Sequence, residues 1–214
     1  MTIDFFKLLR SLTHPPRHVA RLFLEQNKFT GTIPRTIKQL GKLVALDMSG
    51  NRLSGPLPQG IADLVALELF DVKDNTLTGT LPERIGDLSR LKILNLQRQQ
   101  DTTNSLAGFS GAIPTSIGLL VNIAECRLQE NSFTGTLPTE MAKMTSLTFL
   151  NVIDNALTGT ISSDFGSLGV LSEFYLSLNQ FTGSIPSELC AISTLVQLVP
   201  DCSLTCDCCS DCIA

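Results

Sequence analysis

Apolar residues recur along most of the chain in one repeated arrangement of leucine-like and polar positions. The segments NKFTGTIP, NRLSGPLP, NTLTGTLP, NSFTGTLP, NALTGTIS and NQFTGSIP share this arrangement, and GFSGAIP is a shorter seventh copy. Their glycines are separated by 24, 24, 32, 24, 24 and 24 residues: Gly31, Gly55, Gly79, Gly111, Gly135, Gly159 and Gly183. A fixed period of this length predicts a stack of structural repeats, interrupted once by an eight-residue insertion.

Each unit reads L-x-x-L-x-L-x-x-N-x-L-x-G-x-I-P, as in the stretch from Leu67 to Pro82. The L-x-L alternation predicts a short strand whose leucines face inward. The asparagine stands where the chain leaves the strand, and its amide can satisfy buried backbone groups in the turn. We expect these side chains to stack as a ladder, with Gln99 at the register position before the insertion: Asn27, Asn51, Asn75, Asn131, Asn155 and Asn179. One unit cannot bury its apolar face alone, so the repeats must stabilise one another along a solenoid.

The 24-residue period and the x-x-G-x-I-P-x-x-I-G half of the unit resemble the plant-type subclass of leucine-rich repeats. This subclass occurs in receptor-like kinases, receptor-like proteins and polygalacturonase inhibitors, and the resemblance covers roughly Val19 to Pro200. It implies an α/β solenoid: a right-handed, twisted arc with a concave parallel β-sheet, a second short sheet from the T-G-x-I-P segments, and short 3-10 turns on the convex side. It also implies extracellular recognition of peptides, glycans or proteins without catalysis.

The pattern divides the chain into three parts. Residues 1–18 are expected to be an N-terminal capping segment or a truncated boundary, residues 19–200 to form about seven to eight rungs, and residues 201–214 to form a cysteine-rich C-terminal cap. The first part predicts a short helix that starts at Asp4 as N-cap and ends before Pro15 and Pro16. A helix on a membrane surface is the rival interpretation, and its low basic character disfavours it.

The cysteines are concentrated at the C-terminus, in CSLTCDCCSDCIA. A solenoid exposes the apolar edge of its last rung, so we interpret this segment as a disulfide-bonded lid over that rung. Together with Cys190 of the last rung, its five cysteines make six, and six cysteines allow fifteen pairings: Cys190, Cys202, Cys206, Cys208, Cys209 and Cys212. Similar cysteine-rich tails occur on some extracellular algal repeat proteins.

The sequence leaves the connectivity open, with Cys190–Cys202 as one candidate pair, and two other chemistries compete with the lid. Cys190 with Cys202 would close a short loop, worth roughly 3 kcal/mol, whereas the neighbours Cys208 and Cys209 should each bond elsewhere because a bond between them is strained. Zinc is disfavoured because no histidine accompanies the tail cysteines, among which Cys209-x-x-Cys212 has finger-like spacing, and a redox centre lacks its usual context. The seventh cysteine, Cys126, aligns with inward leucines and should be a buried free thiol.

Composition excludes several classes of function. The 214 residues carry a net charge of -4, without a cluster of Lys and Arg, so nucleic acid is not an expected partner. No apolar run is long enough for a membrane span. The histidines, His14 and His18, both precede the repeats, so no rung can supply a catalytic base, and no nucleotide-binding motif is present. We therefore expect neither an enzyme nor a cofactor.

Function should lie on the outward positions of the strands, which stack into columns on the concave face. Phe149, Ile153 and Tyr175 predict an apolar cluster in its C-terminal half, a reasonable anchor for a partner. In the other half Asp47 lies beside Asp71 with Lys73 near, a pair that suits a basic partner or is simply hydrated; calcium needs more oxygens than they offer. The candidate ligand-binding set is Asp47, Asp71, Lys73, Asn95, Arg127, Phe149, Asn151, Ile153 and Tyr175.

The insertion, QQDTTNSLAGF, follows the fourth strand at the rim of this face, near residues 99–107. Its polar residues predict an exposed loop. Either it takes part in ligand binding or it is a tolerated surface insertion. Asn104 imitates the ladder motif, so the register through this segment stays ambiguous.

These observations favour a non-catalytic recognition module, receptor-like or inhibitor-like, that binds a peptide or protein, with a glycan as a further candidate ligand. The competing hypothesis is an intracellular or cell-wall scaffold that uses the solenoid as a rigid spacer. The terminal cysteines favour an extracellular or cell-surface location, with a cytoplasmic one as the alternative. Because no secretory signal precedes the repeats and no membrane segment follows, the chain is expected to be a fragment or an excised ectodomain.

Overall fold

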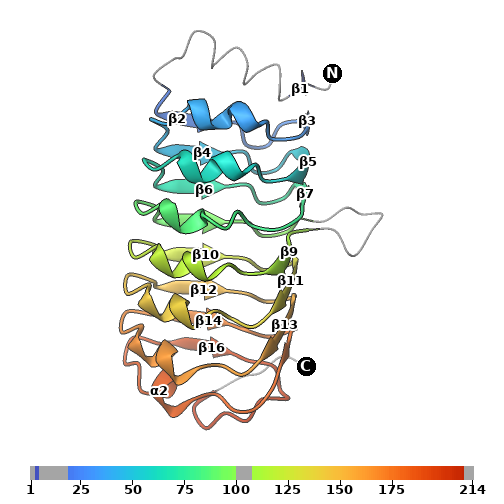
Figure 1. Cartoon of the computed structure of the whole chain (residues 1–214). Helices are drawn as coiled ribbons and strands as arrows, with labels where there is room; N and C mark the ends of the chain where they lie inside the picture. Colours follow the sequence, from blue (N-terminus) through green and yellow to red (C-terminus); the bar gives the residue numbers. More distant parts are fainter. Residues whose placement is uncertain (1–2, 5–18, 100–107, 210–214) are drawn as a thin grey trace.

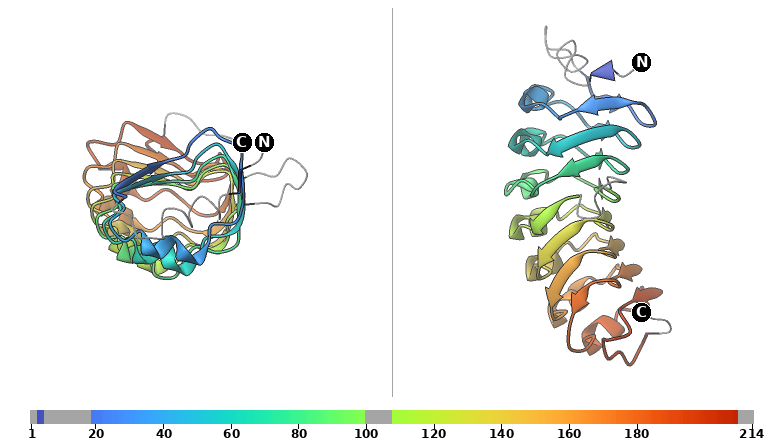
Figure 2. Two further views of the ribbon diagram at one scale, coloured as in Figure 1. Left: turned by 90° about the horizontal axis from the view of Figure 1, so that it is seen from above. Right: turned by 90° about the vertical axis from the view of Figure 1, so that its right-hand side faces the viewer.

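A computed structural model describes residues 3–4, 19–99 and 108–209 of the chain. They form a right-handed α/β solenoid in which one rung follows another along a single axis (Figure 1). The rotation between successive rungs gives the stack its twist (Figure 2, right). Most of the helix predicted in residues 1–18, the insertion beyond Gln99, and Cys212 lie outside the described residues.

The main sheet is parallel and eight-stranded, in the order β16-β14-β12-β10-β8-β6-β4-β2. Each rung contributes one strand of three residues at its L-x-L segment, as the alternation predicted. The strands are β2 (Arg21–Phe23), β4 (Ala45–Asp47), β6 (Leu69–Asp71), β8 (Ile93–Asn95), β10 (Glu125–Arg127), β12 (Phe149–Asn151), β14 (Glu173–Tyr175) and β16 (Gln197–Val199).

The T-G-x-I-P segments form two shorter parallel sheets beside the main one. The first has the order β1 (Ile3–Asp4), β3 (Phe29–Gly31), β5 (Arg52–Pro56) and β7 (Thr76–Thr78). The second has the order β15 (Gln180–Phe181), β13 (Ala156–Gly159), β11 (Ser132–Gly135) and β9 (Ser110–Ala112). A bridge between Gly79 and Phe109 links the two at the insertion. Asp4 was predicted as a helix N-cap, but it belongs to β1, where it pairs with Thr30.

Short 3-10 turns close each rung on the side opposite the main sheet, as the view along the stack shows (Figure 2, left). Most of them start directly after a proline, whose fixed φ suits the entry into a helix and whose missing N–H is not needed there. They are η1 (Arg35–Gln39), η2 (Gln59–Asp63), η3 (Ile85–Asp87), η4 (Thr115–Leu119), η5 (Thr139–Lys143) and η6 (Ser163–Ser167); in the last rung α2 (Ser187–Cys190) takes this place.

Leucine-like side chains from all three sides fill one continuous core. Most of them have no solvent exposure. Phenylalanines at the inward side continue the stack between rungs, with ring centroids 6.3 Å apart for Phe109 and Phe133. Stability is therefore spread along the axis, and each rung depends on its neighbours.

The ladder side chains join the rungs through the turn that follows each strand. Nδ2 of Asn75 donates to the carbonyls of Val72 and Lys73 in its own rung and of Met48 in the preceding rung, at 3.0–3.2 Å. Its Oδ1 accepts the N–H of Leu53 at 2.9 Å. Gln99 makes the same four bonds from its longer side chain and is fully buried. One amide thus bonds four backbone groups at this turn. Of these, the Lys73 carbonyl also accepts the N–H of Gly50 at 3.0 Å.

Candidate ligand-binding face

The outward positions of the main sheet stand in register on neighbouring strands. One column places Glu125, Phe149, Glu173 and Gln197 side by side. The next column reads Phe23, Asp47, Asp71, Asn95, Arg127, Asn151, Tyr175 and Val199. Neighbours within a column are about 4.8 Å apart and neighbouring columns roughly 6.6 Å apart along a strand, so long side chains of adjacent columns reach one another.

Arg127, Phe149 and Tyr175 form one packed group in the C-terminal half of this face. The guanidinium carbon of Arg127 lies 3.9 Å from the centroid of the Phe149 ring, a cation–π contact. The rings of Phe149 and Tyr175 are 5.5 Å apart and tilted by 45°. All three side chains are half-buried, so each presents one edge to solvent and rests on the sheet with the other.

Acidic and amide side chains hold this group in place. Glu125 accepts from Arg127 at 2.9 Å, and Glu173 accepts from the Tyr175 hydroxyl at 2.6 Å. The same hydroxyl lies 2.9 Å from Oε1 of Gln197. A phenol has one hydrogen, so it donates to the carboxylate, and the Gln197 amide can turn its NH₂ group toward the phenol oxygen. Burial, together with the bond to Glu173, raises the pKa of Tyr175 to about 12, so the phenol stays protonated.

Glu125, Glu173 and Gln197 were not among the predicted site residues. Glu125 and Glu173 lie in the column that contains Phe149, directly on either side of it. An acidic residue adjacent to each of Arg127 and Tyr175 was the sequence signal for this network.

Ile153 and Asn151 lie at the exit of β12. Oδ1 of Asn151 accepts the N–H of Ile153 at 3.0 Å, which turns the chain after the strand. Ile153 is half-buried and follows β12 by two residues. The ring contacts of the described residues join Phe149 to Tyr175 and Arg127, whereas Ile153 extends the apolar surface at the edge of this group.

The N-terminal half of the face is polar and largely satisfied by its own backbone. Oδ1 of Asp47 accepts the N–H of Ser49, and Oδ1 of Asp71 accepts that of Lys73, both at 2.9 Å. The second oxygen of Asp71 accepts from the Asn95 amide at 3.0 Å, and the Lys73 ammonium lies 3.9 Å away. Burial raises the pKa of Asp71, and the nearby charge of Asp47 adds to this shift.

The C-terminal cap is disulfide-bonded, but one predicted pair is wrong. Cys190 bonds to Cys208, 18 residues away, and not to Cys202. Cys206 bonds to Cys209, so Cys208 and Cys209 do find partners other than each other. Cys202 is also disulfide-bonded. The tail passes over the last rung and returns to the end of α2, which brings Cys208 rather than Cys202 to Cys190.

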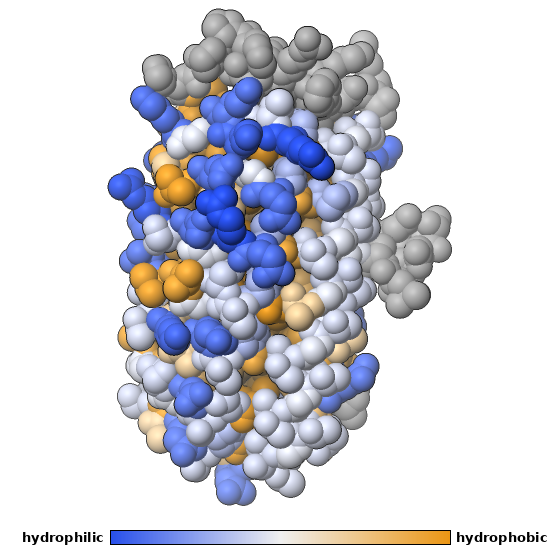
Figure 3. Space-filling view, in the orientation of Figure 1, coloured by the Kyte–Doolittle hydropathy of each residue, from blue (hydrophilic) through white to orange (hydrophobic). Residues whose placement is uncertain are grey.

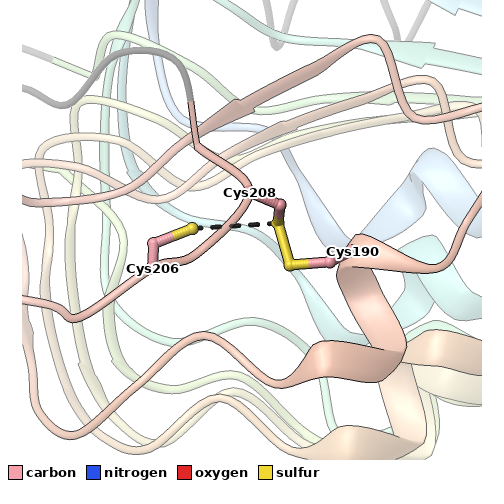
Figure 4. A group of neighbouring side chains, drawn as sticks. All are labelled: Cys190, Cys206 and Cys208. Atoms are coloured by element: carbon pink, nitrogen blue, oxygen red, sulfur yellow. Dashed lines mark hydrogen bonds between the residues drawn. A yellow bond between two sulfur atoms is a disulfide. The ribbon is translucent and has the colours of Figure 1, made fainter.

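Three sulfurs of the cap gather within 4.8 Å, on Cys190, Cys206 and Cys208 (Figure 4). The 3.9 Å contact between Cys206 and Cys208 is a van der Waals contact, because both sulfurs are in disulfides and carry no hydrogen. A structural zinc site needs thiolates, and none of these sulfurs is one in the oxidised cap. Cys126 is the free cysteine of the described residues, and burial raises its pKa to about 12.

The cap also completes the hydrogen bonding of the last ladder position. In an inner rung the N–H of the ladder asparagine donates to the next rung, as Asn155 does to the carbonyl of Leu178. After Asn179 the next strand, β16, leads into the cap instead of into another ladder asparagine. There the carboxylate of Asp201 accepts the N–H groups of Leu178 and Asn179 at 2.5 and 3.3 Å. None of the helices in the described part of the chain is long and apolar enough to cross a membrane.

Comparison with known proteins agrees with this architecture. A family model for the leucine-rich repeat matches residues 42–64, 146–168 and 170–192. No curated protein sequence matches the chain. Among solved structures, the PEPR1–AtPEP1 complex is similar at 30% identity and a TM-score of 0.84, over 94% of this chain and 26% of that one.

Two further structures extend the comparison. The ectodomain of the Arabidopsis receptor kinase HAESA, solved with an N-terminally extended IDA peptide hormone, has 30% identity and a TM-score of 0.76, over 87% of this chain and 30% of that one. A leucine-rich repeat protein of Leptospira interrogans has 29% identity and a TM-score of 0.65, over 86% of this chain and 43% of that one. The chain therefore spans less than half of the length of each of these three structures. The chain contains leucine-rich repeats, and its 24-residue units are similar to those of the plant receptor-kinase ectodomains.

Proposed function

We propose that this chain is a non-catalytic recognition module that binds a peptide or protein ligand on its concave face, in the manner of a receptor ectodomain or an inhibitor. The observation that carries the proposal is the group of Arg127, Phe149 and Tyr175, in which two aromatic edges and a guanidinium are fixed side by side on a rigid sheet. Aromatic and arginine side chains of this kind dominate binding at protein interfaces because they bury much area and lose little conformational freedom.

The proposed contact surface extends from this group along the predicted set. Its charged and amide members would set the register of a ligand, whereas the aromatic group would supply most of the affinity. Glu125 and Glu173 are added to the set, because a basic ligand side chain placed beside either would meet a partly exposed carboxylate. The members are Asp47, Asp71, Lys73, Asn95, Glu125, Arg127, Phe149, Asn151, Ile153, Glu173 and Tyr175.

The comparisons support a peptide or protein ligand over a glycan. HAESA was solved with a peptide hormone, and the plant peptide hormone receptor RGFR1 was solved in complex with RGF2. A glycan has no such support. We propose an extracellular location for the same module, because the bonded cysteines of the cap form and persist in an oxidising compartment. A cytoplasmic scaffold would have to keep the disulfide bonds of the cap in a reducing compartment.

The test uses peptides selected from a random display library on the wild-type protein. Phe149→Ala combined with Tyr175→Ala should weaken binding of the selected peptides by more than about tenfold, the scale of a hot-spot pair. Phe23→Ala is the matched control, because Phe23 is also aromatic and outward on this face but lies five strands from Phe149 and is 54% exposed. Isothermal calorimetry measures affinity, and circular dichroism verifies folding. Peptides that bind both variants equally well would contradict the proposed site.

A further inference from the structure

A second concave surface lies away from the main sheet, on the side that carries the 3-10 turns. It is an open groove of about 760 Å³ across the first three rungs. This volume is within the range of roughly 300–1,000 Å³ that is usual for ligand sites. Prolines and isoleucine-like side chains form its floor, and charged side chains stand at its rim: Ile33, Pro34, Arg35, Lys38, Pro58 and Arg84.

The groove exists because the first interface between 3-10 turns departs from the repeat. In the inner rungs the residue after the buried apolar side chain of the turn is small, and it faces a larger residue of the next rung. Gly86 faces Ser116 in this way, and Gly118 faces Glu140. A Cβ on Gly86 would lie 2.0 Å from the Ser116 carbonyl oxygen, so these turns pack backbone against backbone.

In the first interface the sizes are reversed. Lys38 occupies the small position of its rung, and Gly60 occupies the larger position of the next rung. The nearest side-chain atom to a Cβ on Gly60 would be Cβ of Lys38, at 3.1 Å. The lysine stem therefore lies between η1 and η2 and delivers its ammonium to the groove. Lys38 and Gly60 thus compensate each other in size, which indicates that this interface is adapted to hold the lysine.

The charge of the groove is opposite to that of the whole protein. Three cations line it, on Arg35, Lys38 and Arg84, against one carboxylate on Asp63. Arg84 is paired with Asp63 at 3.1 Å and with Asp87 at 2.6 Å. Within the described part of the chain, neither Arg35 nor Lys38 has an ion pair, although the protein carries a net charge of -4. Hydrophilic side chains gather over these upper rungs in the space-filling view (Figure 3).

We propose that this groove is a second binding site, which takes an extended acidic peptide segment of a partner protein. Carboxylates of the segment would pair with Arg35 and Lys38, and its apolar side chains would lie against the rings of Pro56 and Pro58. Charge complementarity selects the acidic partner. A peptide is favoured over an anionic glycan because no aromatic ring, the usual platform for a sugar, is among the lining residues.

The groove and the aromatic group lie on different sides of the solenoid and on different rungs. The groove is made by residues 32–84, and the aromatic group by residues 125–175. The site is therefore independent of the proposed function, and a protein could occupy it while the concave face holds its own ligand.

The test measures binding of a fluorescein-labelled peptide that alternates glutamate with leucine, by fluorescence anisotropy at low ionic strength. Lys38→Met combined with Arg35→Gln should weaken binding by about tenfold, because the two exposed charge pairs contribute up to about 1 kcal/mol each. Methionine keeps an unbranched stem over Gly60, so the packing of the two turns is retained. Lys42→Met is the matched control, since Lys42 is exposed in the same rung and does not line the groove; it should change affinity less than about twofold.

A second control replaces the glutamates of the peptide by glutamine, which should abolish saturable binding. The proposal is overturned if the original peptide shows no saturable binding to the wild-type protein, or if Lys42→Met weakens binding as much as the combined Lys38→Met and Arg35→Gln variant does. It is also overturned if an oligogalacturonate binds in a Lys38-dependent manner while the peptide does not, because the groove would then serve an anionic glycan. Phe149→Ala should leave binding of the peptide unchanged.

Discussion

The ladder amide is the residue that joins one rung to the next. The turn after each strand presents three carbonyls that accept hydrogen bonds from this amide and one N–H that donates to it. Asparagine offers both from a short side chain, whereas aspartate would present an acceptor where donors are needed. Gln99 shows that the position tolerates a longer amide, provided that both of its ends remain in place.

Asn75→Ala tests this role. The substitution leaves buried backbone groups without partners, and we expect it to lower the free energy of unfolding by about 3 kcal/mol or more, since each such group costs about 1–3 kcal/mol. Asn27→Ala is the matched control, because Asn27 is exposed and its side-chain amide donates to Leu24 and Glu25 of its own rung. That change should cost less than about 1 kcal/mol. Urea unfolding measures both, and equal losses would contradict the ladder.

Asp71 gives a prediction that depends on pH. Its pKa is raised by burial, so the folded state holds the proton more tightly than the unfolded state does. The stability contributed by this group is fully present below the unfolded pKa of about 3.9 and is lost as pH rises through the raised folded value. At neutral pH the wild-type protein therefore carries an unfavourable charge at this position.

Asp71→Asn removes that charge and keeps an acceptor for the Lys73 N–H, as Asn151 does for Ile153. The variant should be more stable than the wild type at pH 7, by no more than about 1 kcal/mol because the bond with Asn95 must rearrange. The difference should shrink as pH approaches about 4. Thermal melts across this pH range measure the stability difference between the variant and the wild type. A difference that favours the variant more at acid pH than at neutral pH would contradict the prediction.

At the scale of the element, the 3-10 turns set how closely the convex side of the stack can pack. Gly86 in η3 and Ser116 in η4 approach through backbone atoms, and the eight-residue insertion lies between these two turns along the chain. Other rungs carry alanine at the same position, at Ala62 and Ala142, so the spacing of each interface is adapted to its own residue.

Gly86→Ala should therefore be destabilising in this rung although alanine is accepted in others. A Cβ 2.0 Å from a carbonyl oxygen forces the two turns apart, a strain of about 1–3 kcal/mol. Gly169→Ala is the control, because a Cβ at Gly169 meets nothing within 4 Å. Chemical denaturation compares the two variants. If they have the same stability, the backbone contact between η3 and η4 does not limit packing.

The repeating elements could be predicted from the sequence, whereas the elements outside the repeat could not. Strands, turns and ladder were predictable because each copy of the repeat reports on the others, so Leu46, Phe70 and Leu94 align without any structure. The two-residue strand β1 was not predictable, because so short a segment carries no periodic signal. The role of Lys38 also depends on which turn faces which, and that follows only from the packing of η1 on η2.

The side-chain contacts at the candidate site could not be predicted for a similar reason. The column positions of Arg127, Phe149 and Tyr175 follow from the repeat, but the contacts among them depend on rotamers. The pairing of Cys190 with Cys208 depends on the path of a tail that belongs to no repeat. The periodic sequence thus predicts the periodic backbone, but it does not predict the contacts among side chains that differ from rung to rung or the path of the tail beyond the repeats.

At the scale of the whole molecule, the solenoid is a one-dimensional stack whose ends lack a neighbour. The cap supplies one at the C-terminal end: Leu204 is buried against the last rung, and Asp201 accepts the N–H groups that a following turn would have bonded. The bond between Cys190 and Cys208 fastens this segment to α2. In a stack with nearest-neighbour coupling, loosening the cap should affect the last rungs first.

Cys190→Ser combined with Cys208→Ser tests this coupling. The pair closes a loop with a separation of 18 residues, which on the chain-entropy relation contributes about 3 kcal/mol. The matched control removes Cys206–Cys209, whose separation is 3 residues and whose expected contribution is about 1.5 kcal/mol. Hydrogen exchange should show faster exchange in β14 and β16 for the first pair of substitutions, while amides of β4 and β6 keep their protection, because opening spreads inward only through neighbours. Uniform loss of protection from β4 to β16 would instead mean that the stack unfolds as one unit and that the cap stabilises all of it equally.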